Sequence, residues 1–294
     1  MTRRPFVIAD VFTDQPYSGN QLAVVFDADG LTKAQMQAIA TEFGFSETTF
    51  VLRPERDDHD VRVRIFTPGV ELPFAGHPTV GTALALAWRR DPDERAPSVV
   101  LGEGAGPVPV ELRYEKGEPV AAEFRAPALP VRGGPVDGQR CVAALGLEPK
   151  DLVLADGLPG EATCGLPFLL VRLADVGALG RARMLDPGLL DGLEASGVFL
   201  FVDGEEIRAR MFSPLDGIGE DPATGSAAAA LAGFLGTLDG PDGTRRWRIR
   251  QGVEMDRPSL IEASARRDHG RVVEVRVGGS AVKVAEGWIT PPPA

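Results

Sequence analysis

Short apolar runs separated by Gly, Pro and Asp recur along most of the chain. These runs are rich in Val, Ile and Phe, which is typical of β-strands. They predict strands at 6–12, 48–52, 61–66, 108–113, 121–125, 168–173, 198–202, 207–212, 247–251, 260–265, 272–277 and 281–285. Helical periodicity is less frequent and predicts helices at 32–43, 78–88, 140–144, 187–194 and 225–235. The pattern favours an α+β fold with many strands over a regular βαβ alternation.

Two of the predicted helices have no polar face. "PTVGTALALAW" at 78–88 and "GSAAAALAGFL" at 225–235 are apolar around the whole circumference and consist largely of small residues. A helix of this kind is buried on all sides. In a chain rich in strands, this predicts a central helix enclosed by a curved mixed β-sheet, and two such helices predict two such units.

A segment rich in Pro and Gly, "RAPALPVRGGPVDG" at 125–138, lies near the middle of the chain and predicts a linker. The first predicted domain covers 1–126 and holds Glu47 and His77, while the second covers 127–280 and holds Asp221 and Ser226. A C-terminal strand around 280–294 is expected to return to the first domain.

The two halves of the chain contain an internal repeat. "RIFTPGVELPFAG" at 64–76 matches "RMFSPLDGIGEDPATG" at 210–225 in the order Arg, Phe, Pro, Glu, Pro and Gly, so that His77 falls opposite Ser226. Both blocks predict a strand, a turn, a glycine and a buried helix. The first N–H groups of a helix have no partner within it and attract anions. We therefore expect both helix starts to bind a small carboxylate, or a developing enolate, in a cleft between the domains.

The bulk composition narrows the class of protein. The chain has 294 residues, 44% of them hydrophobic and 25% charged, as in soluble globular proteins. The net charge of −11 argues against a nucleic acid or an anionic membrane as partner. No apolar run reaches the roughly 18 residues of a membrane helix, so a cytoplasmic enzyme or binding protein is expected.

Neither a metal nor an organic cofactor is expected. The chain has no GxGxxG after a strand, no P-loop and no HExxH motif. Its two cysteines, Cys141 and Cys164, are too few for a disulfide framework and lack the spacing of metal ligands. Two reduced and partly buried thiols are expected instead.

Three polar residues at the two helix starts are candidates for chemistry. His77 can act as acid, base or hydrogen-bond donor, or can simply cap its helix. Asp221 can share a proton with a neighbouring acid or hold a cationic partner, or can form an Asx-turn. Ser226 can cap the second helix and bind a ligand. The other histidines, His59 and His269, lie in charged turns and are expected at the surface.

Glu47, in "FGFSETTFV", is the fourth candidate. Its neighbours Phe45 and Phe50 suggest apolar surroundings, which would raise the pKa of the carboxyl group and suit it to proton transfer near neutral pH. The alternative is a solvated Glu at the start of a strand, and the spacing alone favours neither reading.

Five separated segments resemble the phenazine-biosynthesis PhzF family. They are "DVFTDQPYSGNQLAVV", "FSETTFVL", "RIFTPGVELPFAGHPTVGTA", "RMFSPLDGIGEDPATGSAAAAL" and "QGVEMDRPSLI", and they follow the family's order over nearly the whole chain. The resemblance implies a diaminopimelate-epimerase-like fold of two pseudo-symmetric α+β domains. It also implies a cofactor-independent isomerase that is usually a homodimer, and whose best-known member isomerises trans-2,3-dihydro-3-hydroxyanthranilate.

The resemblance also implies roles for individual residues. The catalytic groups would be Glu47, His77 and Asp221, and the substrate-binding residues would be Ser46, Gly76, Gly225 and Ser226.

Two departures from the family and its relatives bear on the mechanism. The segment Gly19-Asn20-Gln21 stands where the family often has Gly-Asn-Pro. Related epimerases and racemases use two cysteines at the helix starts, where this chain has Ala75 and Thr224. A single carboxylic acid–base is therefore favoured over two thiols.

The leading hypothesis is an isomerase of a small carboxylate metabolite in which Glu47 moves a proton between two carbons. An epimerase or lyase acting on another small acid remains an alternative. A non-catalytic metabolite- or protein-binding relative is the third possibility.

Overall fold

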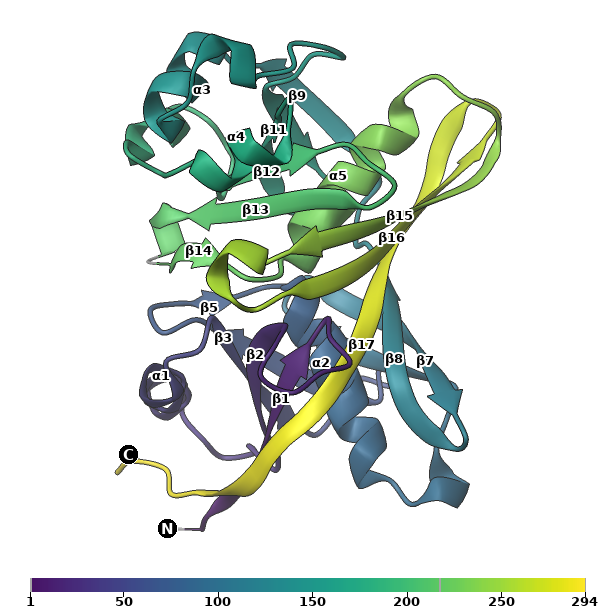
Figure 1. Cartoon of the computed structure of the whole chain (residues 1–294). Coiled ribbons are helices and arrows are strands. Elements are labelled where there is room, and N and C mark those ends of the chain that lie inside the picture. The colour runs from purple at the N-terminus through teal and green to yellow at the C-terminus, as the bar shows by residue number, and fades with distance from the viewer. Residues whose placement is uncertain (1, 217, 294) are drawn as a thin grey trace. The chain divides into compact units, whose positions relative to one another are not determined.

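The computed structural model describes residues 2–216 and 218–293, and its contacts divide the chain into two compact units (Figure 1). The first unit is Met1–Arg125 with Gly278–Ala294, and the second is Ala126–Val277. Strand β17 (Arg271–Ile289) begins in the second unit and ends in the first.

A mixed sheet wraps around one helix in the first unit. Its strands are β1 (Arg4–Val11), β2 (Asn20–Val25), β3 (Glu47–Leu52), β4 (Val61–Phe66), β5 (Glu71–Leu72), β6 (Ser98–Glu103), β7 (Gly106–Glu115), β8 (Glu118–Arg125) and the end of β17. The pairs β2–β3 and β4–β6 are parallel, whereas β1–β2, β3–β4 and β6–β7 are antiparallel. Helix α2 (Gly76–Arg89) contacts six of these strands, β1, β2, β3, β6, β7 and β8.

Small residues let α2 lie this close to the sheet. A Cβ at Gly81 would stand 2.5 Å from a Leu22 methyl carbon and 2.7 Å from one of Val11, so only glycine fits there. The hydroxyl oxygens of Thr82 on α2 and Thr49 on β3 lie 2.9 Å apart, which satisfies both groups inside the core.

Helix α1 (Lys33–Phe43) covers the other face of this part of the sheet. Its start is fixed by a capping box between Thr32 and Gln35, and it ends at Gly44, whose φ is 65°. Its apolar face packs with β2, β3 and β4 in a separate core cluster made of Val25, Ala28, Met36, Ile39, Ala40, Phe50 and Phe66. A short 3-10 turn (Pro92–Glu94) follows α2.

The second unit repeats this architecture around helix α5 (Gly225–Thr237). Its strands are β9 (Val131–Pro135), β10 (Gly160–Thr163), β11 (Pro167–Arg172), β12 (Val198–Val202), β13 (Ile207–Ser213), β14 (Ile218–Asp221), β15 (Gly243–Gln251), β16 (Ser259–Asp268) and the start of β17. Strands β9, β10, β11, β15 and β16 contact α5, while α3 (Gly138–Leu145) and α4 (Val176–Arg181) belong to a second apolar cluster of the unit. The predicted α+β class, with a mixed sheet around a central apolar helix, is confirmed in each unit.

Several predicted elements were wrong. The segment 187–194 is not an α-helix but the 3-10 turn Pro187–Leu190, which Asp186 starts by accepting a hydrogen bond from the N–H of Gly188. The predicted linker at 125–138 contains β9, which pairs with β10. Strands β2, β5, β6, β10 and β14 and helix α4 were missed. The two strands predicted at 272–277 and 281–285 are one strand, β17. Gly278 lies within it, so close to β8 that a Cβ there would stand 2.5 Å from the carbonyl oxygen of Ala122.

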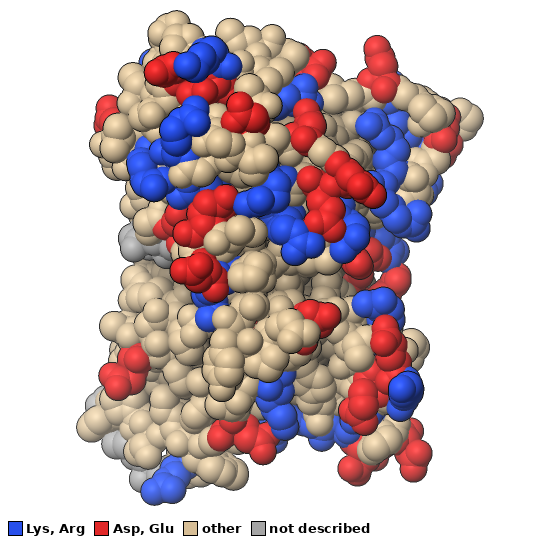
Figure 2. All heavy atoms as spheres, viewed as in Figure 1, with Lys and Arg blue, Asp and Glu red and all other residues tan. Residues whose placement is uncertain are grey.

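Charged side chains of both signs lie at the surface. Figure 2 shows acidic and basic side chains interspersed over one face. Among the helices that the structure describes, none is long and apolar enough to cross a membrane.

Candidate active site

The repeated residues make the same ion pair in each unit. The guanidinium of Arg64 donates to both carboxylate oxygens of Glu71 at 2.6 and 2.8 Å, and that of Arg210 donates to Glu220 at 2.7 and 2.8 Å. Each guanidinium carbon also lies over the phenylalanine ring two residues on, at 5.1 and 4.9 Å from the ring centroid. Such bidentate pairs fix geometry as well as charge. They explain the repeat and hold the turn that leads from each strand into its central helix.

Glu47 and His77 meet in the first unit. Glu47 starts β3, and His77 is the second residue of α2. Glu47 Oε2 lies 3.5 Å from His77 Nε2, slightly beyond a normal hydrogen bond. Only 13% of the Glu47 side chain and 3% of the His77 side chain are exposed, so the two groups lie close together in a largely dry environment.

The imidazole of His77 is neutral at physiological pH. Burial lowers its pKa to about 3, and a hydrogen bond with the backbone of Gln21 opposes this effect only in part. The carboxamide nitrogen of Asn20 lies 3.2 Å from His77 Nδ1, and Nε2 is the ring nitrogen that faces Glu47.

Asn20 was not identified from the sequence as a site residue, although the segment Gly19-Asn20-Gln21 was compared with the family's Gly-Asn-Pro. It lies at the start of β2 and is 1% exposed. The preceding Gly19 has a φ of 67°, and a Cβ there would stand 2.3 Å from the carbonyl oxygen of Val11. The buried carboxylate of Asp10 accepts a hydrogen bond from the N–H of Tyr17 at 2.6 Å and so holds the same loop. The loop therefore presents Asn20 to the histidine.

The surroundings of Glu47 differ from those expected. Side chains alternate along a strand, so Thr49 shares the face of Glu47 and its hydroxyl bonds to α2. Phe50 lies on the opposite face, in the cluster under α1. Phe45 stacks on Phe43, with ring centroids 6.0 Å apart. The prediction that Phe50 surrounds Glu47 was therefore wrong, because it counted neighbours along the chain.

The start of α2 has no side-chain cap. Its N-cap residue is Ala75, and its first internal bond runs from the N–H of Thr79 to the carbonyl of Ala75 at 3.2 Å. The N–H groups of Gly76 and His77 precede this bond, and Pro78 has none. His77 is therefore not the helix cap, and the site combines its ring with the positive end of a helix.

Asp221 and Ser226 lie at the corresponding turn of the second unit. Thr224 is the N-cap residue of α5, but its hydroxyl donates to the Asp221 carboxylate instead of capping the helix. The first internal bond of α5 runs from the N–H of Ala228 to the carbonyl of Thr224 at 3.0 Å. The N–H groups of Gly225 and Ser226 precede it, so Ser226 is the second helix residue and not its cap.

Gln251 holds this turn from β15 and was missed in the sequence. Its carboxamide oxygen accepts from the N–H of Thr224 at 3.1 Å, and its nitrogen donates to the carbonyl of Asp221 at 2.7 Å. The Ser259 hydroxyl donates to the carbonyl of Pro222 at 3.1 Å. Gly252 has a φ of 74°, and its Cα hydrogens leave room for that carbonyl. The "QGVEMDRPS" segment thus shapes the start of α5.

Ser46 and the two cysteines add little to the description of the site. Ser46 lies half-buried directly before Glu47. Both cysteines are buried, and burial raises the pKa of Cys141 to about 11 and that of Cys164 to about 12, so neither is a thiolate at neutral pH. Among the described residues, no group of three or more His, Cys, Asp and Glu is placed to hold a metal ion.

The surface prediction for the other histidines was right in one case. His269 is at a hairpin tip, with 95% of its side chain exposed. His59 is only 6% exposed at its side chain, because its ring packs on Gly102, where a Cβ would stand 2.5 Å from a ring carbon.

The sequence and the fold of this chain are similar to those of known proteins. An uncharacterized isomerase from Mesorhizobium japonicum is 40% identical over 98% of this chain and 99% of its own length. The trans-2,3-dihydro-3-hydroxyanthranilate isomerase of Pseudomonas aeruginosa is 38% identical over 96% of this chain and 98% of its own. The crystal structure of a PhzF-family phenazine biosynthesis protein from Bacillus anthracis superposes with a TM-score of 0.87 at 27% identity, covering 99% of this chain and 100% of that one.

The family model described as phenazine biosynthesis-like protein matches residues 9–287, nearly the whole chain. This segment includes both helix starts and all five motifs that carried the resemblance. The chain therefore belongs to the phenazine biosynthesis-like family and is an isomerase of that family.

Proposed function

We propose that this chain isomerises a small carboxylate metabolite by an acid–base proton shift, without a cofactor. The observation that carries the proposal is the Glu47–His77 pair, in which a carboxyl group lies 3.5 Å from an imidazole that burial keeps neutral. Because His77 does not carry a second proton near pH 7, the group that takes and returns the proton is Glu47. His77 orients Glu47 and the substrate through its ring nitrogens.

The uncapped helix starts bind the negative charge of the substrate. At Gly76 and His77 of α2, backbone N–H groups precede the first internal bond of the helix, as they do at Gly225 and Ser226 of α5. Such groups stabilise a carboxylate or a developing enolate without any basic side chain. Asp221, whose carboxylate accepts from the Thr224 hydroxyl, orients the substrate.

The test uses trans-2,3-dihydro-3-hydroxyanthranilate, the substrate named for the Pseudomonas aeruginosa relative, as the probe. The chain is first dialysed against a chelator and assayed with no cofactor added. Reaction in deuterated water is followed by NMR, and we expect an isomerised product with deuterium at the carbon that gains a proton. Release of water or inversion of one centre would indicate a lyase or an epimerase instead.

Glu47→Gln tests the role of the carboxyl group. General acid–base catalysis contributes about 10²- to 10⁴-fold, so kcat should fall by at least about 10²-fold. Glu42→Gln, which changes an exposed glutamate of α1, is the matched control and should leave kcat unchanged. A loss of less than about tenfold in Glu47→Gln would refute the assignment.

A further inference from the structure

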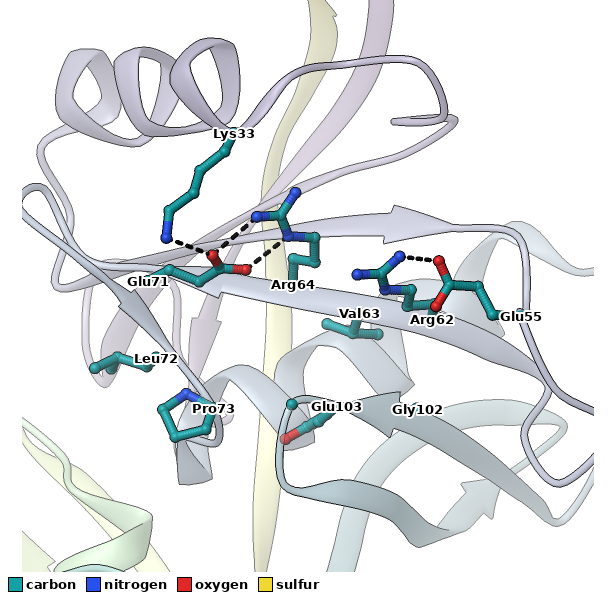
Figure 3. Close-up of a pocket in the computed structure, with 11 residues that line it drawn as sticks. Lys33, Glu55, Arg62, Val63, Arg64, Glu71, Leu72, Pro73, Gly102 and Glu103 are labelled. Atoms are coloured by element: carbon teal, nitrogen blue, oxygen red, sulfur yellow. Dashed lines mark hydrogen bonds and ion pairs between the residues drawn. The ribbon is translucent and has the colours of Figure 1, made fainter.

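A second buried carboxyl group in the first unit has no part in the proposed reaction. Glu103 ends β6 and is only 7% exposed. Figure 3 shows it across a cavity from the Glu71 ion pairs. Its Oε1 lies 2.7 Å from the hydroxyl oxygen of Thr79, and within the described part of the chain its buried Oε2 has no hydrogen-bond partner. An ionised carboxylate would be costly in this position.

The hydrogen bonds of Thr79 identify the protonated form. Its hydroxyl oxygen lies 2.7 Å from the carbonyl oxygen of Ala75 and 2.7 Å from Oε1 of Glu103. A hydroxyl has one proton, and a carbonyl can only accept. Both bonds are fully formed when Thr79 donates to Ala75 and the carboxylic acid of Glu103 donates to Thr79, whereas an ionised Glu103 would have to share the single hydroxyl proton with Ala75. Burial raises the pKa of Glu103 to about 8, and the hydrogen bond with Thr79 opposes this rise only in part.

The charged groups around Glu103 are already paired with one another. Those that line the two neighbouring cavities are Lys33, Glu55, Arg56, Asp58, His59, Arg62, Arg64 and Glu71. Lys33 and Arg64 pair with Glu71, Arg62 pairs with Glu55, and Arg56 and His59 pair with Asp58. The lysine and the arginines are thus committed to other carboxylates, which leaves burial as the dominant influence on Glu103.

The tip of the β6–β7 hairpin also holds the turn before α2. The N–H of Ala105 donates to the carbonyl of Pro73 at 2.8 Å. A Cβ at Gly104 would stand 2.9 Å from the Cα of Pro73, so the two backbones touch. The hairpin therefore fixes Pro73 on one side of the Gly76–His77 turn, and Glu103, through Thr79, fixes Ala75 beside it.

We propose that Glu103, as a neutral carboxylic acid, is a positioning residue that holds the first turn of α2 and thereby places Gly76 and His77. When Glu103 ionises, the Thr79 hydroxyl turns to the new carboxylate and leaves the carbonyl of Ala75. The first turn of α2 loosens, and His77 moves relative to Glu47. The catalytic consequence rests on the proposed function, whereas the structural consequence does not.

The first test needs no turnover. The chain has three histidines, so the ring NMR signals of His77 can be assigned with His59→Gln and His269→Gln variants. In the wild type we expect these signals to shift with a midpoint near pH 8, following Glu103. In Glu103→Gln, whose carboxamide donates to Thr79 but does not titrate, they should stay constant between pH 6 and 9.5. Constant signals in the wild type, or the same midpoint in the variant, would overturn the proposal.

The second test measures kcat/KM on trans-2,3-dihydro-3-hydroxyanthranilate against pH. The wild type should lose activity with a midpoint near pH 8, and Glu103→Gln should keep its activity through that range. Glu103→Leu, which cannot donate to Thr79, should be about tenfold less active at every pH. An alkaline decline that persists in Glu103→Gln would overturn the positioning role. If the probe is not turned over, the proposed function fails for this substrate, while the His77 signals still decide the inference.

Discussion

Replacing Glu103 by Gln should stabilise the chain above pH 4.5. The pKa of Glu103 is about 8 in the folded chain and 4.5 in its ordinary state. Between these values the unfolded chain has released the proton and the folded chain retains it, so the free energy of unfolding falls as pH rises. Below pH 4.5 Glu103 is protonated in both states, so its burial does not lower the free energy of unfolding. Above pH 8 it is ionised in both states, and the loss of stability has reached its full size.

The size of this effect follows from the same two values. The interval from 4.5 to about 8 corresponds to about 5 kcal/mol, at about 1.36 kcal/mol for each pH unit. About 3 kcal/mol of this is already present at pH 7. Glu103→Gln removes the titrating group and keeps a donor for Thr79, so its free energy of unfolding should exceed that of the wild type by a margin that grows with pH.

The assay is urea unfolding between pH 4 and 9 at constant ionic strength. A Trp247→Phe background removes the tryptophan of the second unit, so that fluorescence reports the first unit through Trp88 on α2 and Trp288 on β17. The difference between Glu103→Gln and the parent should rise by about 1.4 kcal/mol for each pH unit and level off near pH 8. The exposed Glu42→Gln should show no such slope. A difference that is independent of pH would refute the buried neutral acid.

Three further predictions concern the two helix starts. His77→Asn should remove a loss of stability at low pH. The pKa of His77 is about 3 in the folded chain and 6.5 ordinarily, so the free energy of unfolding of the wild type falls as pH falls from 6.5 to 3, and equal pH slopes of the two proteins in urea unfolding would contradict this. Asn20→Ala should lower kcat by about tenfold with little change in KM, because the His77 ring loses a hydrogen bond that orients it, and an unchanged kcat would exclude that role. Gln251→Ala should lower the free energy of unfolding by about 1–3 kcal/mol and raise KM, because it removes the hydrogen bonds from Gln251 to the carbonyl of Asp221 and to the N–H of Thr224. A variant as stable as the wild type would contradict this.

The central features of the fold follow from local patterns. The absence of a polar face predicted that α2 and α5 are buried, since such a helix has no side to turn to water. The repeat predicted equivalent turns, and in each unit its arginine pairs with its glutamate, Arg64 with Glu71 and Arg210 with Glu220. These contacts join residues only 7 and 10 positions apart, so one short sequence motif contains both partners.

The residues that complete each site were hidden because their partners are distant in sequence. Asn20 lies 57 positions from His77, Gln251 lies 30 from Asp221, and Glu103 lies 24 from Thr79. Each contact joins segments that are distant along the chain, and the sequence around neither residue indicates it. The same holds for His59, whose charged neighbours suggest the surface although its ring packs on a glycine of the next strand.

The N-cap residues of the two central helices leave each helix start open to an anion. Ala75 cannot cap α2, and the hydroxyl of Thr224 is used by Asp221, so neither helix has the side-chain cap that typically contributes about 1 kcal/mol. An uncapped start reduces stability, and it leaves backbone N–H groups for an anion to satisfy. The same positions hold no thiol, and the two cysteines are buried with raised pKa values. The absence of a reactive thiol at these positions supports the proposal that a carboxyl group transfers the proton, with Glu47 as the carboxyl group beside the neutral imidazole of His77.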